Sequence, residues 1–482
     1  MNKYNTHIVI EYLLISIIVL LTLYVRTYKL NSPLADWHSW RQADTSAVTR
    51  RFVREGIDLL HPKYDDLSNI PSGKDNPLGL RFVEFPFVNA ITAVFSKLYP
   101  LISLEVWGRL TSILFSLGAT LTLYFIMKIY ATRIVAVATA LIFALLPFNI
   151  YYHRTILPEV PMLFFSLVAF YYFLRWSETE KQGELIISAV AGAAALLLKP
   201  FVIFMVFPML YQVWRKWDLG ILRKKELYWY FAIVVIPFLL WRLWAAQYPQ
   251  GIPANAWLLN GSGIRFRPAF FRWIFAERIG KLILGYWGLI PLAIGFIRKP
   301  LNKAGWLFHW WLFGMGAYLI IFATGNVTHD YYQIFIIPPI VIFTALGLDF
   351  LIITKTQLFQ RTLAILLAVT AVIFWFGFSW FYIRDFFNIN HPEIVEAGEM
   401  ADAILPSDAK VVAPYLGDTA FLYQTKRQGW PIGGQIKDKI EKGATDYVTV
   451  NFDEETNFLL SRCKPAIKTD RYVIISLRNC SL

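Results

Sequence analysis

Charged and aromatic side chains crowd the segment that follows the first hydrophobic run of the sequence. Residues 36–45 supply carboxylates, an imidazole, a guanidinium, an amide and an indole, on Asp36, His38, Trp40, Arg41, Gln42 and Asp44. A carboxylate at such a position can act as a general base that removes a proton from an acceptor hydroxyl. A solvated interfacial loop with aromatic anchors has the same composition. The segment therefore predicts either a catalytic site or an interface loop.

A second polar segment, residues 151–159, lies where the chain turns between two hydrophobic runs. Arg154 precedes Pro158, and proline is typical of the first turn of a helix. Glu159 is then expected in that turn, near the outer surface. A carboxylate there is either a favourable partner for the helix dipole or a second acidic group that faces the same cavity as Asp36.

Basic residues also occur in the expected loop 247–281, although outer loops are normally poor in them. The loop carries Arg265, Arg267, Arg272, Arg278 and Lys281. Arginine binds phosphate through paired hydrogen bonds, so one interpretation is a site for a phosphate or pyrophosphate. The alternative is that long loops are exempt from the charge rule. Lys199, at the same face, either adds a cation to that site or simply extends to the interface.

The segment 324–332 contains a fourth polar cluster, with His329, Asp330 and Tyr331. These side chains could bind a hydroxylated ligand or a metal, but adjacent residues on a helix point apart, so no metal site is predicted. The two cysteines, Cys463 and Cys480, cannot form a zinc site alone. Whether they form a disulfide is left open.

The composition predicts that membrane-spanning helices position these segments. Hydrophobic residues make up 57% of the 482 residues and charged residues 16%, against roughly 25% charged in soluble domains. The mean hydropathy is +0.47. Because a span needs about 20 apolar residues, we expect an α-helical integral membrane protein. Its spans, about eleven in number, are centred on 8–26, 106–127, 134–150, 159–174, 185–198, 200–214, 229–246, 282–297, 305–323, 333–353 and 362–381. The shorter apolar stretch 85–99 is expected to lie in the interface.

Basic residues fall in alternate short gaps between these runs, which places those gaps and the N-terminus in the cytoplasm. We therefore expect a membrane domain at 1–382 with a periplasmic loop at 27–105, followed by a small periplasmic α/β domain at 383–482. These gaps also account for much of the net charge of +13, so no nucleic-acid partner is predicted. The sequence has no P-loop or Gly-rich dinucleotide fingerprint, which argues against a nucleotide-driven pump.

At these polar segments the sequence resembles the membrane glycosyltransferases of the family C superfamily, specifically bacterial relatives of family 39. That group is similar to protein O-mannosyltransferases and lipid A aminoarabinose transferases. The strongest match is the segment 38–45, His-Ser-Trp-Arg-Gln-Ala-Asp-Thr, which resembles the signature His-x-Trp-Arg-Gln-Ala-Asp-Thr. Segments 154–155, 158–159 and 329–332 add to a resemblance that covers about residues 8 to 380.

The resemblance implies inverting transfer of a sugar from a polyprenyl monophosphate donor to a hydroxyl of a lipid, glycan or protein acceptor. The reaction would take place on the outer face of a bacterial cytoplasmic membrane. Carried over by position, Asp36 is the expected catalytic base, Asp44 its competitor, and Glu159 the second acidic position. The family's usual Asp-Glu pair is absent from this loop. No cofactor is required, although a divalent metal could bind. Substrate contacts are expected from His38, Trp40, Arg41, Gln42, Arg154, Lys199, Arg265, Arg267, His329, Asp330 and Tyr331.

Two other functions compete with this interpretation. A flippase or transporter of lipid-linked saccharide would place charged groups at the membrane midplane, whereas the polar segments gather at one face. A lipid-linked oligosaccharide ligase or polymerase would share the outer face and differ in its pyrophosphate-linked donor. The transferase interpretation predicts that the acidic segment and the arginines of loop 247–281 share one pocket.

Overall fold

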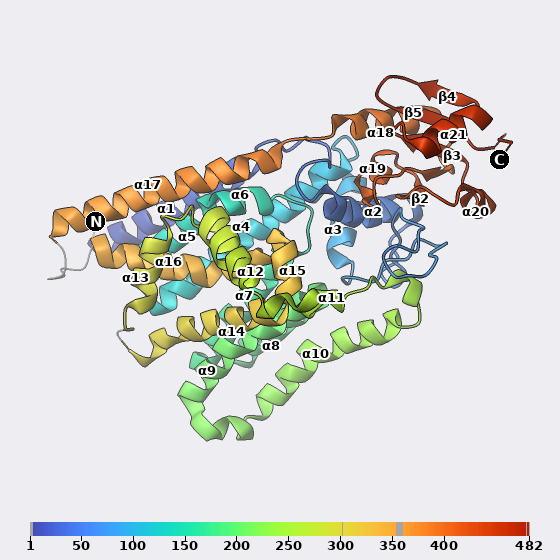
Figure 1. Ribbon diagram of the computed structural model, residues 1–482. Coiled ribbons are helices and arrows are strands. Elements are labelled where there is room, and N and C mark those ends of the chain that lie inside the picture. The colour runs from blue at the N-terminus through green and yellow to red at the C-terminus, as the bar shows by residue number, and fades with distance from the viewer. Residues whose placement is uncertain (1–2, 301, 353–359, 479, 482) are drawn as a thin grey trace.

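The computed structural model describes residues 3–300, 302–352, 360–478 and 480–481. Figure 1 shows a bundle of long helices with a small mixed domain at one end, where the C-terminus lies. Helix α1 (Lys3–Arg26) belongs to the bundle, and helix α17 (Arg361–Ile383) leads from the bundle towards the small domain. The expected helical membrane protein with a small C-terminal α/β domain is confirmed.

Seven helices among the described residues are long and apolar enough to cross a membrane. They include α1, α4 (Leu104–Tyr130), α7 (Glu159–Thr179), α10 (Lys225–Ala245) and α17. The expected count of eleven is not confirmed, because other apolar runs form shorter or interrupted helices. Proline, which lacks a backbone N–H, stands at several interruptions. Pro147 follows the end of α5 (Arg133–Leu145), and Pro200 opens the 3-10 turn η1 (Pro200–Met205) before α9 (Val206–Trp217).

Shorter elements complete the bundle. They are α6 (Pro147–Tyr152), α8 (Gln182–Leu198), η2 (Asp218–Arg223), η3 (Pro249–Gly251), α11 (Trp257–Asn260), η4 (Gly261–Phe266), α12 (Pro268–Phe271), η5 (Arg272–Ile283), α13 (Leu289–Ile297), η6 (Lys303–Trp306), α14 (Leu307–Ile321), α15 (Ala323–Thr328), η7 (Asp330–Ile336), α16 (Ile337–Ile352) and η8 (Arg384–Phe387). Helices α13 and α16 pack closely at Gly295, which has no side chain. A Cβ there would lie 1.8 Å from the Phe343 carbonyl oxygen.

Two helices form in the loop 27–105, α2 (Ser39–Glu55) and α3 (Phe87–Leu98). Helix α2 begins directly after His38, whose backbone adopts a left-handed φ of 54°. It buries Ala43, Ala47 and Phe52. Helix α3 packs against α2 and α4 and occupies the stretch that the sequence predicted to lie in the interface. The loop is therefore an ordered platform on which the signature segment is helical.

The C-terminal domain is a five-stranded mixed sheet in the order β2-β1-β3-β5-β4. Strands β2, β1 and β3 are parallel, and β5 joins β3 and β4 in antiparallel pairs. A disulfide joins Cys463 to Cys480. In chain order the elements are α18 (Pro392–Ile404), β1 (Lys410–Val412), α19 (Thr419–Gln424), β2 (Gln428–Trp430), α20 (Ile436–Glu441), β3 (Asp446–Thr449), α21 (Glu454–Arg462), β4 (Pro465–Lys468) and β5 (Val473–Ser476).

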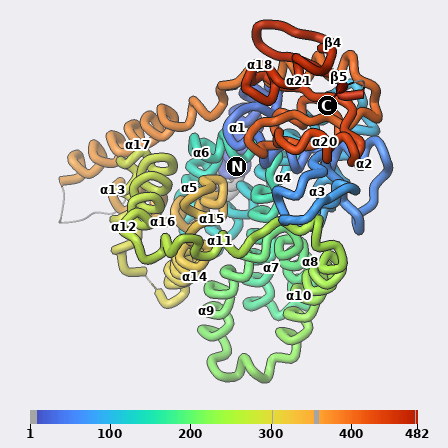
Figure 2. The backbone as a smooth tube through the Cα atoms, turned by 45° about the vertical axis from the view of Figure 1, so that its right-hand side comes forward, coloured from blue at the N-terminus to red at the C-terminus, as the bar shows by residue number. Residues whose placement is uncertain are grey.

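This domain is docked on the loop 27–105: α19 packs against α2, and Figure 2 shows the red domain beside the blue loop. The backbone N–H of Leu67 donates to the Gly429 carbonyl at 2.8 Å, and the N–H of Gly429 donates to Asp65 at 2.9 Å. The Arg50 guanidinium donates to the Tyr423 carbonyl at 3.2 Å. The loop thus extends the β2 edge of the sheet, and loop and domain form one assembly over the helices.

Candidate active site

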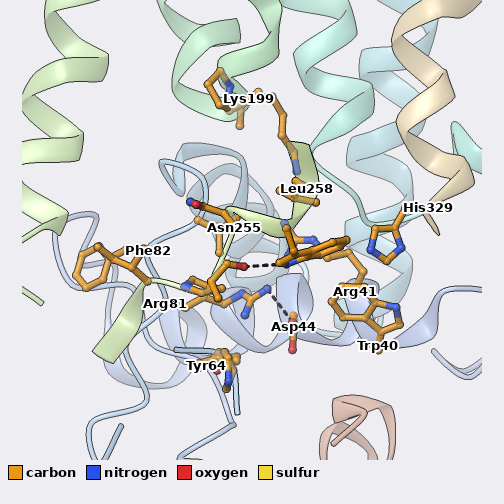
Figure 3. Close-up of a pocket in the computed structure, with 18 of the residues that line it drawn as sticks. Trp40, Arg41, Asp44, Tyr64, Arg81, Phe82, Lys199, Asn255, Leu258 and His329 are labelled. Atoms are coloured by element: carbon orange, nitrogen blue, oxygen red, sulfur yellow. Dashed lines mark hydrogen bonds and ion pairs between the residues drawn. The ribbon is translucent and has the colours of Figure 1, made fainter. Parts of the chain in front are cut away.

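A cavity of about 570 Å³ lies where the outer loop, the helix ends and the C-terminal domain meet. Its wall includes Asp44 from α2, Lys199 after α8, and Arg242 from α10. Figure 3 shows Lys199 coming from the helices above and Asp44 with Trp40 from α2 below. The C-terminal domain adds Gly417 and Thr419 to the wall. One space therefore collects charged groups from distant parts of the chain.

Asp44 is the acidic residue of the signature segment that lines this cavity. Its Oδ2 lies 2.7 Å from Nη2 of Arg81, and its Oδ1 accepts a hydrogen bond from Oγ1 of Thr419 at 2.7 Å. The Arg81 guanidinium in turn lies 4.8 Å from the ring centroid of Tyr64. Asp44 is thus a buried carboxylate whose two oxygens are oriented by two different segments.

Two positive charges at the cavity wall are partly neutralised by buried glutamate carboxylates. Nζ of Lys199 lies 2.9 Å from Glu84 and 2.8 Å from Glu159, and Arg41 also pairs with Glu84. Burial alone would raise the pKa of Glu84, but Arg41 and Lys199 lower it to about 2. Glu84 therefore stays ionised, and it holds both cations at the wall.

Arg242 differs from these cations because it forms no ion pair among the residues that the structure describes. It lines the cavity from the last turn of α10 and is only partly buried. Asp66 also lies at the wall, and burial raises its pKa to about 6. Arg242 could therefore bind an anionic ligand in this cavity, because no carboxylate of the described residues pairs with its guanidinium group.

Asp36 does not line the cavity. Its carboxylate is fully buried, with Oδ2 2.9 Å from Nη2 of Arg154 and Oδ1 accepting from Nε2 of Gln42 at 2.8 Å. Arg154 also donates to the Lys29 carbonyl at 3.0 Å. These three predicted site residues thus form a network that joins the end of α1 to α2 and to the segment after α6.

The cluster around Asp330 lies partly behind the cavity wall. Asp330 accepts hydrogen bonds from Nε1 of Trp37 at 3.0 Å and from Tyr152, and its Oδ1 lies 2.6 Å from Nε2 of His38. His329 and Tyr331 do line the cavity, and their rings stack with centroids 5.2 Å apart. These two consecutive residues therefore have different environments: Asp330 is a buried hydrogen-bond acceptor, and His329 lines the cavity.

Arg265 and Arg267 do not share a pocket with the acidic segment, which corrects the geometric expectation for loop 247–281. Arg265 donates to the carbonyls of Ile320 and Ile321 at 2.6 and 2.8 Å, where α14 ends. Arg267 is exposed. The part of the loop that covers the cavity carries neutral residues such as Asn255 and Leu258. Arg265 instead satisfies helix-end carbonyls, which lack intrahelical partners.

Sequence reasoning missed Glu84, Arg81, Arg242 and Thr419. Arg242 offered a signal, because a single charge in an apolar helix is a functional candidate. Thr419 offered none, because an isolated threonine in a soluble domain has no distinctive pattern. Among the described residues, no three His, Cys, Asp or Glu side chains gather in a way that could hold a metal ion.

Comparison with known proteins identifies the fold. Residues 83–244 match the family model of dolichyl-phosphate-mannose-protein mannosyltransferases. No curated protein sequence matches the chain. ArnT from Cupriavidus metallidurans, solved with undecaprenyl phosphate, is 13% identical with a TM-score of 0.67, and the alignment covers 96% of this chain and 97% of ArnT. The Archaeoglobus fulgidus oligosaccharyltransferase is 11% identical with a TM-score of 0.57, covering 90% of this chain and 67% of that one. These matches confirm the family C glycosyltransferase fold that the signature segment predicted.

Proposed function

We propose that this chain, a multi-pass membrane protein with the family C glycosyltransferase fold, transfers a sugar with inversion from a polyprenyl phosphate donor to an acceptor hydroxyl. The observation that carries the proposal is that Asp44 opens onto the same cavity as Lys199 and Arg242. The undecaprenyl phosphate bound to the similar ArnT supports the choice of donor. We place the reaction on the outer face of a bacterial cytoplasmic membrane, because the basic short gaps orient the loop 27–105 outward.

In the proposed step Asp44 accepts the proton of the acceptor hydroxyl. The acceptor oxygen then bonds to the anomeric carbon from the face opposite the phosphate, and the electron pair of the breaking bond leaves on the polyprenyl phosphate. Because negative charge grows on that phosphate, cations placed beside it stabilise the transition state more than the ground state. A preorganised group of this kind is worth roughly 3 to 4 kcal/mol. The donor is already activated, so the step needs no nucleotide and no obligatory metal.

We assign the base to Asp44 and not to Asp36, the residue expected from the sequence. A general base must reach the proton that it removes, and Asp44 is at the cavity wall. Asp36 is not part of that wall, and its side chain has no exposed surface. We assign Arg242 and Lys199 to the donor phosphate, and Trp40, His329 and Tyr331 to the sugar, whose apolar faces fit aromatic rings.

The test uses the full chain in lipid nanodiscs with a radiolabelled polyprenyl phosphate sugar and a panel of acceptors extracted from bacterial envelopes. The variant Asp44→Asn should bind the donor but lose transfer by about 10²-fold or more. The matched control Asp58→Asn changes an exposed carboxylate of the same loop and should transfer at the wild-type rate.

Full transfer by Asp44→Asn would remove Asp44 from the role of base. If the wild type yields no labelled glycan but moves the labelled lipid across vesicles, the chain is a flippase. Transfer only from a pyrophosphate-linked saccharide would make it a ligase or polymerase.

A further inference from the structure

The C-terminal domain reaches into the cavity through the turn that precedes α19. Gly417 and Thr419 line the wall, and Asp418 caps the helix by accepting from the Ala420 N–H at 2.7 Å. The chain enters this turn with left-handed backbone at Leu416 (φ 55°) and Gly417 (φ 83°). These conformations turn the chain sharply, so that the first residue of α19 faces α2.

Thr419 contacts the proposed base directly. Its Oγ1 lies 2.7 Å from Oδ1 of Asp44 and 3.2 Å from the carbonyl oxygen of Trp40. A hydroxyl has one proton to donate, and a carboxylate is the stronger acceptor, so the shorter contact is the main hydrogen bond. The Thr419 side chain is buried, with 8% of its surface exposed. This hydrogen bond therefore forms away from bulk water.

The position of α19 is fixed from several sides. The Arg50 guanidinium lies 4.0 Å from the Tyr423 ring centroid, and Tyr423 donates to Glu105 at 2.6 Å. Nε2 of Gln424 donates to the Leu34 carbonyl at 2.9 Å. Because these contacts hold the helix against the loop 27–105 and α4, they keep the backbone of Thr419 beside Asp44.

We propose that Thr419 is a positioning residue for the general base, so that the C-terminal domain completes the active site. The inference rests on the proposed function. Each carboxylate oxygen has about two lone-pair directions, and Thr419 and Arg81 occupy one on each oxygen of Asp44. The remaining directions are then fixed relative to the cavity, where the acceptor hydroxyl must lie. Without Thr419 the carboxylate can rotate, and fewer molecules hold it in the productive orientation.

The test compares Thr419→Val, which keeps the shape but removes the hydroxyl, with Thr419→Ser, which keeps the hydroxyl. The valine variant should lower kcat by about 10- to 100-fold, the range expected for a hydrogen bond to a charged group. Its KM for the polyprenyl phosphate sugar should stay within about twofold, because Thr419 does not belong to the proposed phosphate site. The serine variant should recover most of kcat.

The matched control is Thr425→Val, which removes a buried hydroxyl at the end of the same helix. Thr425 donates to the Leu422 carbonyl at 2.7 Å and makes no contact with Asp44, so kcat should not change. Wild-type kcat in Thr419→Val, or equal losses in the valine and serine variants, would overturn the inference while leaving the proposed function in place. A wild type that transfers no sugar would overturn both.

Discussion

A variant of Asp36, which forms a buried ion pair with Arg154, can distinguish a structural role of this carboxylate from a catalytic one. Both side chains have 0% of their surface exposed, and their charged atoms are 2.9 Å apart. In Asp36→Asn the guanidinium loses its counter-charge but keeps its hydrogen bond to the Lys29 carbonyl. Removing one partner of a buried pair costs about 3 to 5 kcal/mol, and the retained bond favours the lower end. For a chain of 482 residues, whose unfolding entropy is about 1 kcal/mol/K, we expect the unfolding temperature to fall by about 3 °C.

The assay is thermal unfolding in detergent, measured beside sugar transfer per folded molecule. The double variant Asp36→Asn with Arg154→Met should recover most of the lost stability, since replacing both partners of a buried pair by groups of similar volume is often neutral. Asp44→Asn should show the opposite pattern: near-wild-type stability with no transfer. If Asp36→Asn unfolds like the wild type yet transfers no sugar, Asp36 performs chemistry and the structural assignment is refuted.

Two further predictions concern charges at and beside the cavity wall. Arg242→Gln should raise the KM for the donor by about tenfold or more, while Lys225→Gln at the other end of α10 should leave it unchanged; equal KM values for the two variants would contradict the phosphate assignment. Burial raises the pKa of Asp418 from 3.8 to about 6, so the folded state holds this proton more tightly than the unfolded state. The contribution of this carboxyl to stability is therefore fully present below about pH 4 and is lost as the pH rises through 6. Asp418→Asn, which keeps the helix cap, should gain up to about 3 kcal/mol at pH 8 and little at pH 4. An equal gain at both pH values would contradict this cause.

The signature segment shows how far sequence reasoning reached. The motif at 38–45 correctly predicted the fold, and it contained one candidate base, Asp44, while the other, Asp36, lies just before it. Choosing between them required the start of helix α2, which lies at Ser39. Residues three and four apart share a helix face, so a start at Ser39 places Trp40 and Asp44 together on the cavity side. Asp36 precedes the helix and turns to Arg154.

The basic loop shows where sequence reasoning failed. A run of arginines in an outer loop predicted a phosphate site, but Arg265 serves the end of α14 and Arg278 lies 3.5 Å from Asp330. Carbonyls at helix ends need donors, and Arg265 and Arg278 donate to such carbonyls. Among the cations at the cavity wall, Arg242 is the one without a carboxylate partner in the described part of the chain, and it lies in a helix whose hydropathy predicts only a membrane span.

The sequence by itself determined that the protein lies in a bilayer, which fold class it has, and which reactive side chains it contains. The apolar composition predicts a bilayer, because transfer of apolar side chains out of water is favourable and does not depend on their order within a span. The signature motif can be recognised because its residues are consecutive in the sequence. Only the tertiary structure decided which charges meet. Asp44 and Thr419 are far apart in the chain, yet their side chains are 2.7 Å apart. Such pairings depend on how helix ends and the C-terminal domain pack, a property of three-dimensional contact that no local pattern encodes.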